Sequence, residues 1–142
     1  MNKAAFAELA EYMDLLLDAI CVVDQQHRFS YLSPGTQRVF GYTPDEMMNR
    51  SMFDFIHPDD HQTTMAIAQK INSGDQVVHF ENRYIRKDGS VAHILWSARW
   101  SERDQRRVGV ARDISEQKRL EHDRESLIAR LEHMALTDPL TQ

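Results

Sequence analysis

The residue types that could do chemistry gather at one place in this chain, around position 60. The group consists of His57, Asp59, Asp60 and His61, and imidazole with carboxylate is a donor set that zinc accepts. Pro58, however, is typical of the first position of a helix, which puts His57 on the cap, away from the face that carries His61. Acids in a first helical turn are also favoured by the helix dipole. We therefore interpret the group as a helix start and predict no metal site there.

The chain has a single cysteine, Cys21. One thiol cannot form an internal disulfide, and this is typical of proteins from a reducing compartment. Cys21 lies in a short apolar run, where a cysteine usually packs as a small hydrophobic side chain. The sequence therefore predicts a buried structural thiol.

Composition excludes several classes of protein. The 142 residues are 42% hydrophobic and 27% charged, with a formal net charge of -5, as in a soluble globular protein of one domain plus accessory helices. The sequence has no cluster of lysine and arginine residues that could neutralise phosphates, so nucleic acid is not expected as the main partner. No apolar run reaches the roughly 18 residues of a membrane span, and acidic residues near the N-terminus argue against a signal peptide. We expect a cytoplasmic protein without a membrane segment.

Helical and strand patterns follow one another along the chain. An amphipathic helix is expected over residues 3–17, where Phe6, Leu9 and Leu16 recur at helical spacing. The other expected elements are strands 19–24 and 29–32, short helices from 36 and 43, a helix from 57 to about 72, strands 77–86, 91–101 and 108–114, and a helix from 115 to about 136. This order predicts an α+β fold, a five-stranded antiparallel sheet with short helices on one face.

Four segments resemble the motifs of PAS/PAC sensory domains. Residues 40–46 (FGYTPDE) resemble the family's FGYTPEEL segment, and residues 57–60 its HPDD turn. Residues 80–90 (FENRYIRKDGS) resemble the hairpin FExRxxRKDGS, and residues 110–119 (VARDISEQKR) the exit motif GxxRDITERK. The four stand in the family's order and span about residues 15 to 119. The resemblance implies the PAS fold, which agrees with the elements expected from pattern.

A second resemblance lies at the C-terminus. Residues 136–141 (LTDPLT) are similar to the LTDxLTGLxNR opening of GGDEF diguanylate cyclase domains, although Gln142 stands where glycine is usual. The resemblance implies a bacterial protein in which a PAS domain controls synthesis of cyclic di-GMP. The chain lacks the catalytic domain, so we expect no catalytic residues and no enzyme activity in this fragment. We divide it into an N-terminal helix (1–17), a PAS/PAC domain (18–114), a signalling helix (115–137) and the start of a GGDEF domain (138–142).

The resemblance to PAS domains implies a ligand pocket between sheet and helices. The candidate pocket residues are Phe40, Phe55, Asn82, Tyr84 and Trp96. Light-sensing relatives carry a reactive cysteine in a short helix that here, at residues 49–53, has none, so a flavin adduct is excluded. A haem ligand is also not expected, because residues 61–72 offer one imidazole at their start. The cofactor stays undetermined: none, a small molecule, or a non-covalent flavin.

The exit motif implies a signal relay formed by Asp113, Ile114 and Ser115. In the family this aspartate ties the last strand to the signalling helix, and a basic residue such as Arg83 or Lys87 could be its partner. An ordinary N-terminal cap without a signalling role is the alternative.

The final helix carries a partly polar heptad seam. Leucines and methionine recur at seven- and four-residue intervals, while Gln117 and Arg124 interrupt them. The predicted seam residues are Leu120, Leu127, Leu131 and Met134. Because a cyclase needs two catalytic domains face to face, we expect a parallel homodimer through this helix, the N-terminal helix, or both; a helix folded back on its own sheet is the alternative.

The predicted function is therefore a sensory PAS domain that controls a C-terminal diguanylate cyclase through a dimeric linker helix. One alternative is the input domain of a histidine kinase, although His133 lacks the acid and arginine that such kinases place after the phosphorylated histidine. The other is a PAS domain without ligand that serves dimerisation alone.

Overall fold

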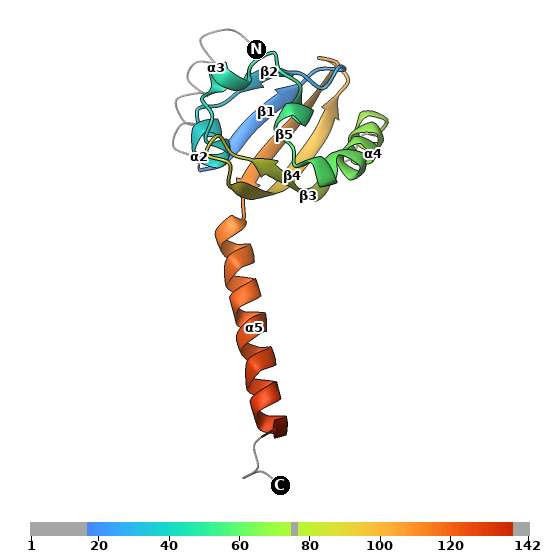
Figure 1. Cartoon of the computed structure of the whole chain (residues 1–142). Coiled ribbons are helices and arrows are strands. Elements are labelled where there is room, and N and C mark those ends of the chain that lie inside the picture. Colours follow the sequence, from blue (N-terminus) through green and yellow to red (C-terminus); the bar gives the residue numbers. More distant parts are fainter. Residues whose placement is uncertain (1–16, 75–76, 138–142) are drawn as a thin grey trace.

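Five strands form one antiparallel sheet in the computed structural model, which describes residues 17–74 and 77–137. The strands are β1 (Ala19–Val23), β2 (Phe29–Leu32), β3 (Val78–Ile85), β4 (Val91–Ser101) and β5 (Arg106–Asp113). Their order across the sheet is β2-β1-β5-β4-β3, so β5, the last of these five strands in sequence, lies in the middle (Figure 1). The predicted five-stranded antiparallel sheet is confirmed.

The β1–β2 hairpin consists of a strand whose residues alternate between buried and half-buried, followed by a polar turn. Along β1, Ala19, Cys21 and Val23 are buried and the residues between them are half-buried, as expected for a strand with one face on the core. The Oδ1 oxygen of Asp24 accepts hydrogen bonds from the backbone N–H groups of residues 26 and 28, at 2.9 and 3.0 Å, and these close the turn. The predicted burial of the cysteine is confirmed.

Short helices connect β2 to β3. They are α2 (Thr36–Phe40), α3 (Pro44–Met47), the 3-10 turns η1 (Met52–Asp54) and η2 (Pro58–Asp60), and α4 (His61–Asn72). A capping box begins α3: the Thr43 hydroxyl accepts from the Glu46 N–H, and the Glu46 carboxylate accepts from the Thr43 N–H. Gly41 ends α2 with a φ of 77°, in the left-handed region that glycine adopts without strain.

The single helix predicted from residue 57 to about 72 is divided in two, which corrects the sequence interpretation. Pro58–Asp60 form a 3-10 turn, in which Nδ1 of His57 accepts from the N–H of Asp59 at 3.1 Å. Asp60 then has φ -102° and ψ 0°, values outside the α-helical region. The chain therefore bends at Asp60, and α4 starts at His61.

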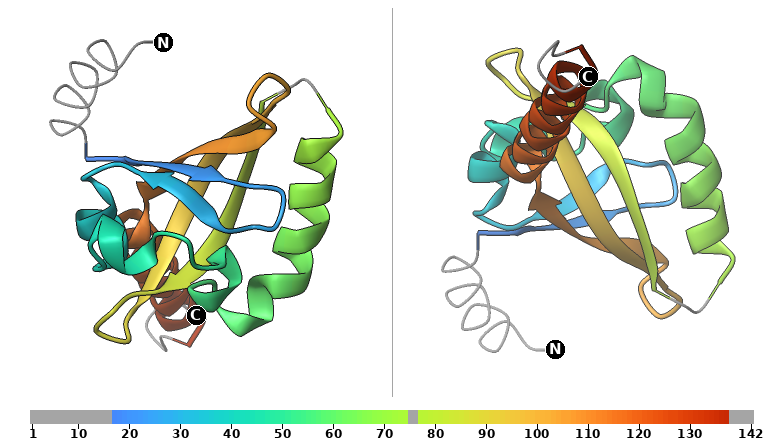
Figure 2. Two further views of the ribbon diagram at one scale, coloured as in Figure 1. Left: turned by 90° about the horizontal axis from the view of Figure 1, so that it is seen from above. Right: turned by 90° about the horizontal axis from the view of Figure 1, so that it is seen from below.

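The core lies between the sheet and these helices. Phe40 of α2 packs against Tyr84 of β3 and Trp96 of β4, with ring centroids 4.7 and 6.3 Å apart. Such aromatic pairs add about 0.5–1.5 kcal/mol each beyond burial of their area. α4 lies along one flank of the domain (Figure 2) and buries Ala68 and Ile71. Short helices and sheet thus enclose a common aromatic core.

One long helix, α5 (Ser115–Thr137), projects away from the domain (Figure 1). Its first turns contact the sheet, where Ser115 binds β4 and Lys118 binds β3. Side chains from residue 119 to 135 are exposed apart from the half-buried Ser126. The predicted N-terminal helix and the predicted GGDEF start fall on residues 1–16 and 138–142, outside the described residues. Among the described helices, none is long and apolar enough to cross a membrane.

Candidate functional site

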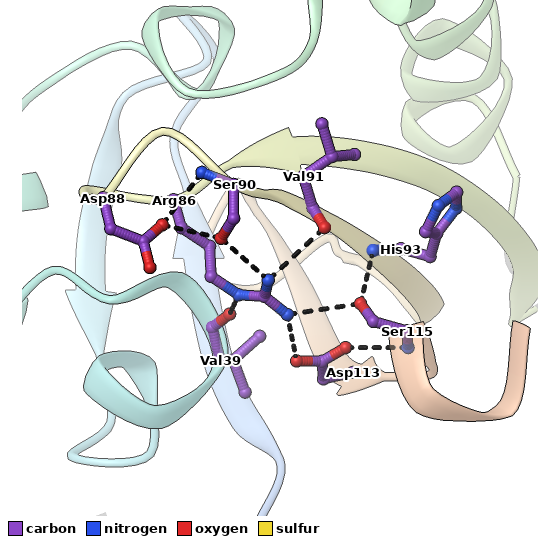
Figure 3. A network of polar contacts seen from close by, with 8 residues as sticks. All are labelled: Val39, Arg86, Asp88, Ser90, Val91, His93, Asp113 and Ser115. Carbon is purple, nitrogen blue, oxygen red and sulfur yellow. Dashed lines mark hydrogen bonds and ion pairs between the residues drawn. The ribbon is translucent and has the colours of Figure 1, made fainter. Parts of the chain in front are cut away.

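Arg86 joins the β3–β4 hairpin to the junction between β5 and α5 (Figure 3). Its Nη2 nitrogen lies 2.7 Å from Oδ2 of Asp113 and 3.2 Å from Oγ of Ser115. Its Nη1 donates to Oγ of Ser90 at 3.0 Å, and its Nε donates to the carbonyl of Val39 at 3.4 Å. One guanidinium therefore contacts α2, the hairpin turn, the end of β5 and the first residue of α5.

Ser115 holds the first turn of α5 against the sheet. Its hydroxyl accepts from the backbone N–H of His93 at 2.9 Å, and its own N–H donates to Oδ1 of Asp113 at 2.9 Å. Between them, the backbone N–H of Ile114 donates to the carbonyl of His93 at 2.9 Å, and the Ile114 side chain is buried. The three predicted relay residues thus lie together at the junction.

The Asp113 carboxylate is charged and only 28% exposed. Burial acts to raise its pKa, but hydrogen bonds from Ser115 and Arg86 outweigh this and hold the pKa of Asp113 below its usual range. The carboxylate accepts from the backbone at the start of α5 with one oxygen and from Arg86 with the other. It therefore connects the first residue of α5 to the hairpin.

A second contact ties α5 to the sheet one turn further on. The Nζ of Lys118 lies 3.1 Å from Oε1 of Glu81 on β3. Both side chains are 40% exposed or more, so the pair contributes little to stability by itself. It adds a contact between α5 and β3 beyond the Ser115 junction.

Neither Arg83 nor Lys87, the two candidates considered from the sequence, pairs with Asp113. The Nη2 of Arg83 lies 2.7 Å from Oδ1 of Asp60, and the Nζ of Lys87 lies 2.6 Å from Oε2 of Glu46. Arg83 lies on β3, which β4 separates from β5, whereas Lys87 follows Arg86 in the same turn and its side chain is held by Glu46 instead. The partner is Arg86.

A small cavity lies inside the core, and three of the five predicted pocket residues line it. These are Asn82, Tyr84 and Trp96. Phe40 and Phe55 are buried but do not line the cavity; Phe40 packs against the rings of Tyr84 and Trp96 from α2.

Three polar side chains of the cavity wall are joined by successive hydrogen bonds. The indole Nε1–H of Trp96 donates to Oδ1 of Asn82 at 2.8 Å, and Nδ2 of Asn82 donates to Oγ1 of Thr64 at 3.3 Å. These bonds join β4, β3 and α4 inside the core. Because buried polar groups without partners are costly, they fix the side-chain positions around the cavity.

The cavity volume is about 30 Å³. A water molecule needs at least about 10–15 Å³ by the same measure, so one or two waters fit. Pockets for drug-sized ligands measure about 300–1,000 Å³. The flavin that the sequence left as an alternative therefore does not fit these residues as they are packed, and haem does not fit either.

The residues around position 60 are engaged with neighbouring protein groups. His61 Nε2 lies 2.8 Å from the carbonyl of Ile56, His57 caps η2, and Asp60 binds Arg83. Across residues 17–74 and 77–137, no three His, Cys, Asp or Glu side chains converge as a metal site.

The predicted seam residues lie on an apolar stripe of α5. Leu120, Leu127, Leu131 and Met134 are each 54–58% exposed. Ile128 is also exposed and was missed, because it sits one residue from a seam position and outside the heptad spacing. No partner chain is present, so dimerisation stays a prediction.

Two arginines escaped the sequence interpretation, Arg86 at the junction and Arg107 in the core. Arg107 shares the inward face of β5 with Gly109 and Ala111, and it is 6% exposed. The two-residue period of side-chain direction along β5 could have revealed the buried Arg107, because this period places the arginine on the face of the strand that packs on the core.

The fold and motifs agree with a known family. A family model described as PAS fold matches residues 7–114. The PAS domain of a protein from Colwellia psychrerythraea is 22% identical, with a TM-score of 0.67, over 79% of this chain and 98% of that one. A domain of a sensory box sensor histidine kinase/response regulator from Geobacter sulfurreducens is 20% identical, with a TM-score of 0.65, over 79% and 97%. These likenesses show the fold.

A curated relative is the White collar 2 protein of Neurospora crassa, 32% identical over 82 residues. The match covers 57% of this chain and 15% of that protein. The chain thus spans a small part of the length of the curated relative it matches.

Proposed function

The chain belongs to the PAS family of sensory domains, and from this premise we propose that it is the input module of a C-terminal diguanylate cyclase. In this proposal the output passes through α5 and catalysis belongs to the output domain. The observation that carries the proposal is the Arg86 network, which binds hairpin, sheet and the first residue of α5 at once. A shift of the hairpin would be transmitted to the helix through these bonds.

α5 has the properties of a signalling helix that pairs with the same helix of a second copy of the chain. Beyond its first turns the helix projects away from the domain (Figure 1), and its apolar stripe stays exposed. A helix with such a stripe needs a partner to bury it. Arg124 interrupts the seam, and a weak seam suits a linker that changes register or crossing angle between two states.

The choice of output rests on the sequence of the C-terminus. Residues 136–141 resemble the opening of a GGDEF domain, directly after α5. A coupling of about 1–3 kcal/mol between the PAS domain and the paired helices would change cyclase output about 5- to 150-fold.

The test uses the full-length protein that the proposal assumes, with its output domain after Gln142. Conversion of GTP to cyclic di-GMP is measured for the wild type, Arg86→Gln and Asp113→Asn, with Arg99→Gln as the matched control, since Arg99 is exposed on β4. We expect the first two variants to change the rate by at least about fivefold and the control to leave it unchanged. Absence of any cyclase activity in the wild type would refute the proposed output. Equal activity in all four would refute the role of the network.

A second candidate function is the input of a histidine kinase. Similar solved structures include domains whose descriptions name sensor histidine kinases, and this favours it. The sequence around His133 departs from the pattern of phosphorylated histidines, as described above. Autophosphorylation of the parent protein with labelled ATP, lost in a His133→Gln variant, would establish this function in place of the cyclase.

A further inference from the structure

Arg107 is a buried cation with no ion-pair partner among the described residues. It lies on β5, is 6% exposed, and lines the core cavity. The carboxylate that acts on it electrostatically is Asp24. That carboxylate is not within ion-pair distance and is occupied with the backbone of its own turn. A buried charge without a counter-charge is costly, so the guanidinium needs an explanation.

The neighbours of Arg107 are neutral acceptors. Its Nη1 donates to Oδ1 of Asn72 at 3.0 Å, and its Nη2 lies 3.2 Å from Nδ1 of His27 and 3.3 Å from the sulfur of Met52. Burial and the charge of Arg107 lower the pKa of His27, so its ring is neutral near pH 7 and accepts the bond. These contacts position the guanidinium but do not balance its charge.

The rest of the cavity wall offers donors and apolar surface. No carboxylate lines the cavity, and Thr64, Asn82 and Tyr84 contribute a hydroxyl, an amide and a phenol. Burial raises the pKa values of Cys21 and Tyr84, so both line the cavity as neutral groups. The cavity therefore has one positive charge, several hydrogen-bond donors and no negative group.

We propose that this cavity binds one small monovalent anion, of the size of chloride, beside the guanidinium of Arg107. The volume of about 30 Å³ fits an ion little larger than a water molecule and excludes nucleotides, sugars and aromatic metabolites. An anion there would supply the missing counter-charge for the guanidinium of Arg107, and the hydroxyl and amide groups of the cavity wall are of the kind that can donate to it.

The position of the cavity connects the anion to the β1–β2 turn, to α4 and to β3. Arg107 contacts the β1–β2 turn through His27 and the end of α4 through Asn72. Asn82, which also lines the cavity, belongs to β3, the strand that leads into the Arg86 hairpin. The inference deepens the proposed function, on which it rests for its signalling meaning, because it names the chemical class that the sensor binds.

Binding is measured on the chain itself, without any output domain. Sodium chloride replaces sodium gluconate at constant ionic strength, because gluconate is too large for the cavity. Emission of Trp96, which lines the cavity, is followed in a Trp100→Phe background, together with the thermal midpoint. We expect a saturable emission change and a midpoint that rises with chloride concentration, as for any ligand that binds only the folded state.

Three variants in that background decide the location of the site. Arg107→Met removes the charge and should weaken chloride binding by about tenfold or more, the equivalent of losing one charged hydrogen bond. Ala68→Val narrows the cavity from α4 while keeping Arg107, and should have the same effect even if Arg107→Met fails to fold. Arg99→Met removes an exposed arginine and should bind as the parent does.

Two results would overturn the inference. One is an absent or non-saturating response in the parent chain. The other is an equal response in all variants, which would place the ion on the surface. Because no output is measured, failure here leaves the control of a cyclase through α5 untouched, and loss of cyclase control leaves anion binding untouched.

Discussion

The Nη2 nitrogen of Arg86 lies 2.7 Å from the Oδ2 oxygen of Asp113, although 27 residues separate them in sequence. The pair bridges the β3–β4 turn and the end of β5, and its side chains are 21% and 28% exposed. An ion pair this sheltered, with hydrogen bonds on both partners, is stronger than an open surface pair. It is the main polar connection between the sensory domain and α5.

Removing this connection should loosen the start of α5. Arg86→Gln should lower the free energy of unfolding by about 1.5–3 kcal/mol, the range for hydrogen bonds to charged groups. It should also speed amide hydrogen exchange at residues 115–118, measured by mass spectrometry. Arg99→Gln is the control and should change neither. Unchanged exchange in Arg86→Gln would mean that Ser115 and Lys118 hold the helix alone.

Charge placed in the apolar stripe of α5 should abolish dimerisation. Leu127→Glu with Leu131→Glu puts two carboxylates in the predicted seam, where apolar contact is needed. Ala129→Glu with His133→Glu adds the same charge on the other side of the helix. Light scattering should report monomers for the first pair and dimers for the second. A full dimer with the seam changed would leave the segment before residue 17 as the main interface.

The stability of the domain should fall in acid through Asp60. Hydrogen bonds from Arg83 lower the pKa of Asp60, although burial opposes them. A lowered pKa stabilises the fold above the unfolded value of about 3.9, and this contribution is lost as the pH falls through the folded value. Asp60→Asn should therefore melt below wild type at pH 6, and the difference should shrink by pH 3.

Asp59→Asn is the control for that comparison, because its side chain is 75% exposed. Its melting temperature should follow that of the wild type across the same range. A difference between Asp60→Asn and wild type that stays constant with pH would contradict an electrostatic origin.

Cys21 should be inert in the folded protein. Burial raises the pKa of its thiol, and the thiolate is the reactive form. Ellman's reagent at pH 8 should therefore titrate no thiol in the native chain and one after denaturation. In a Ser73→Cys variant, with the new thiol at an exposed position, one native thiol should react. Rapid native reaction of the wild type would mean that β1 opens readily.

Two glycines should respond differently to alanine. Gly41 has a φ of 77°, so Gly41→Ala should cost about 1–2 kcal/mol of folding free energy, the penalty for a left-handed residue with a side chain. A Cβ on Gly74 would meet only ordinary contact with the Lys70 carbonyl at 3.6 Å. Gly74→Ala should therefore be neutral within about 0.5 kcal/mol in urea denaturation.

The sequence predicted local features well, because local residues determine them. The short helix that begins after Thr43 and the pair of strands on either side of residues 87–90 each depend on residues a few positions apart. The partner of Asp113 depends instead on how the β3–β4 turn packs against α2, α3 and the end of β5, which directs the side chain of Arg86 to Asp113 and that of Lys87 to Glu46. The size of the cavity could not be predicted from the sequence either, since it results from how all the core side chains pack.

The central position of β5 also determines when the protein can fold during its synthesis. The β1–β2 hairpin and the β3–β4 hairpin share no strand contact, because β5 lies between them. β5 is the last strand of this sheet to be synthesised, so the two hairpins can join into one sheet only after residue 113 has emerged. Since long-range pairing of this kind is slow, the nascent chain must hold two separate half-sheets until then. The sensory domain and the base of its signalling helix are therefore completed in one and the same folding event.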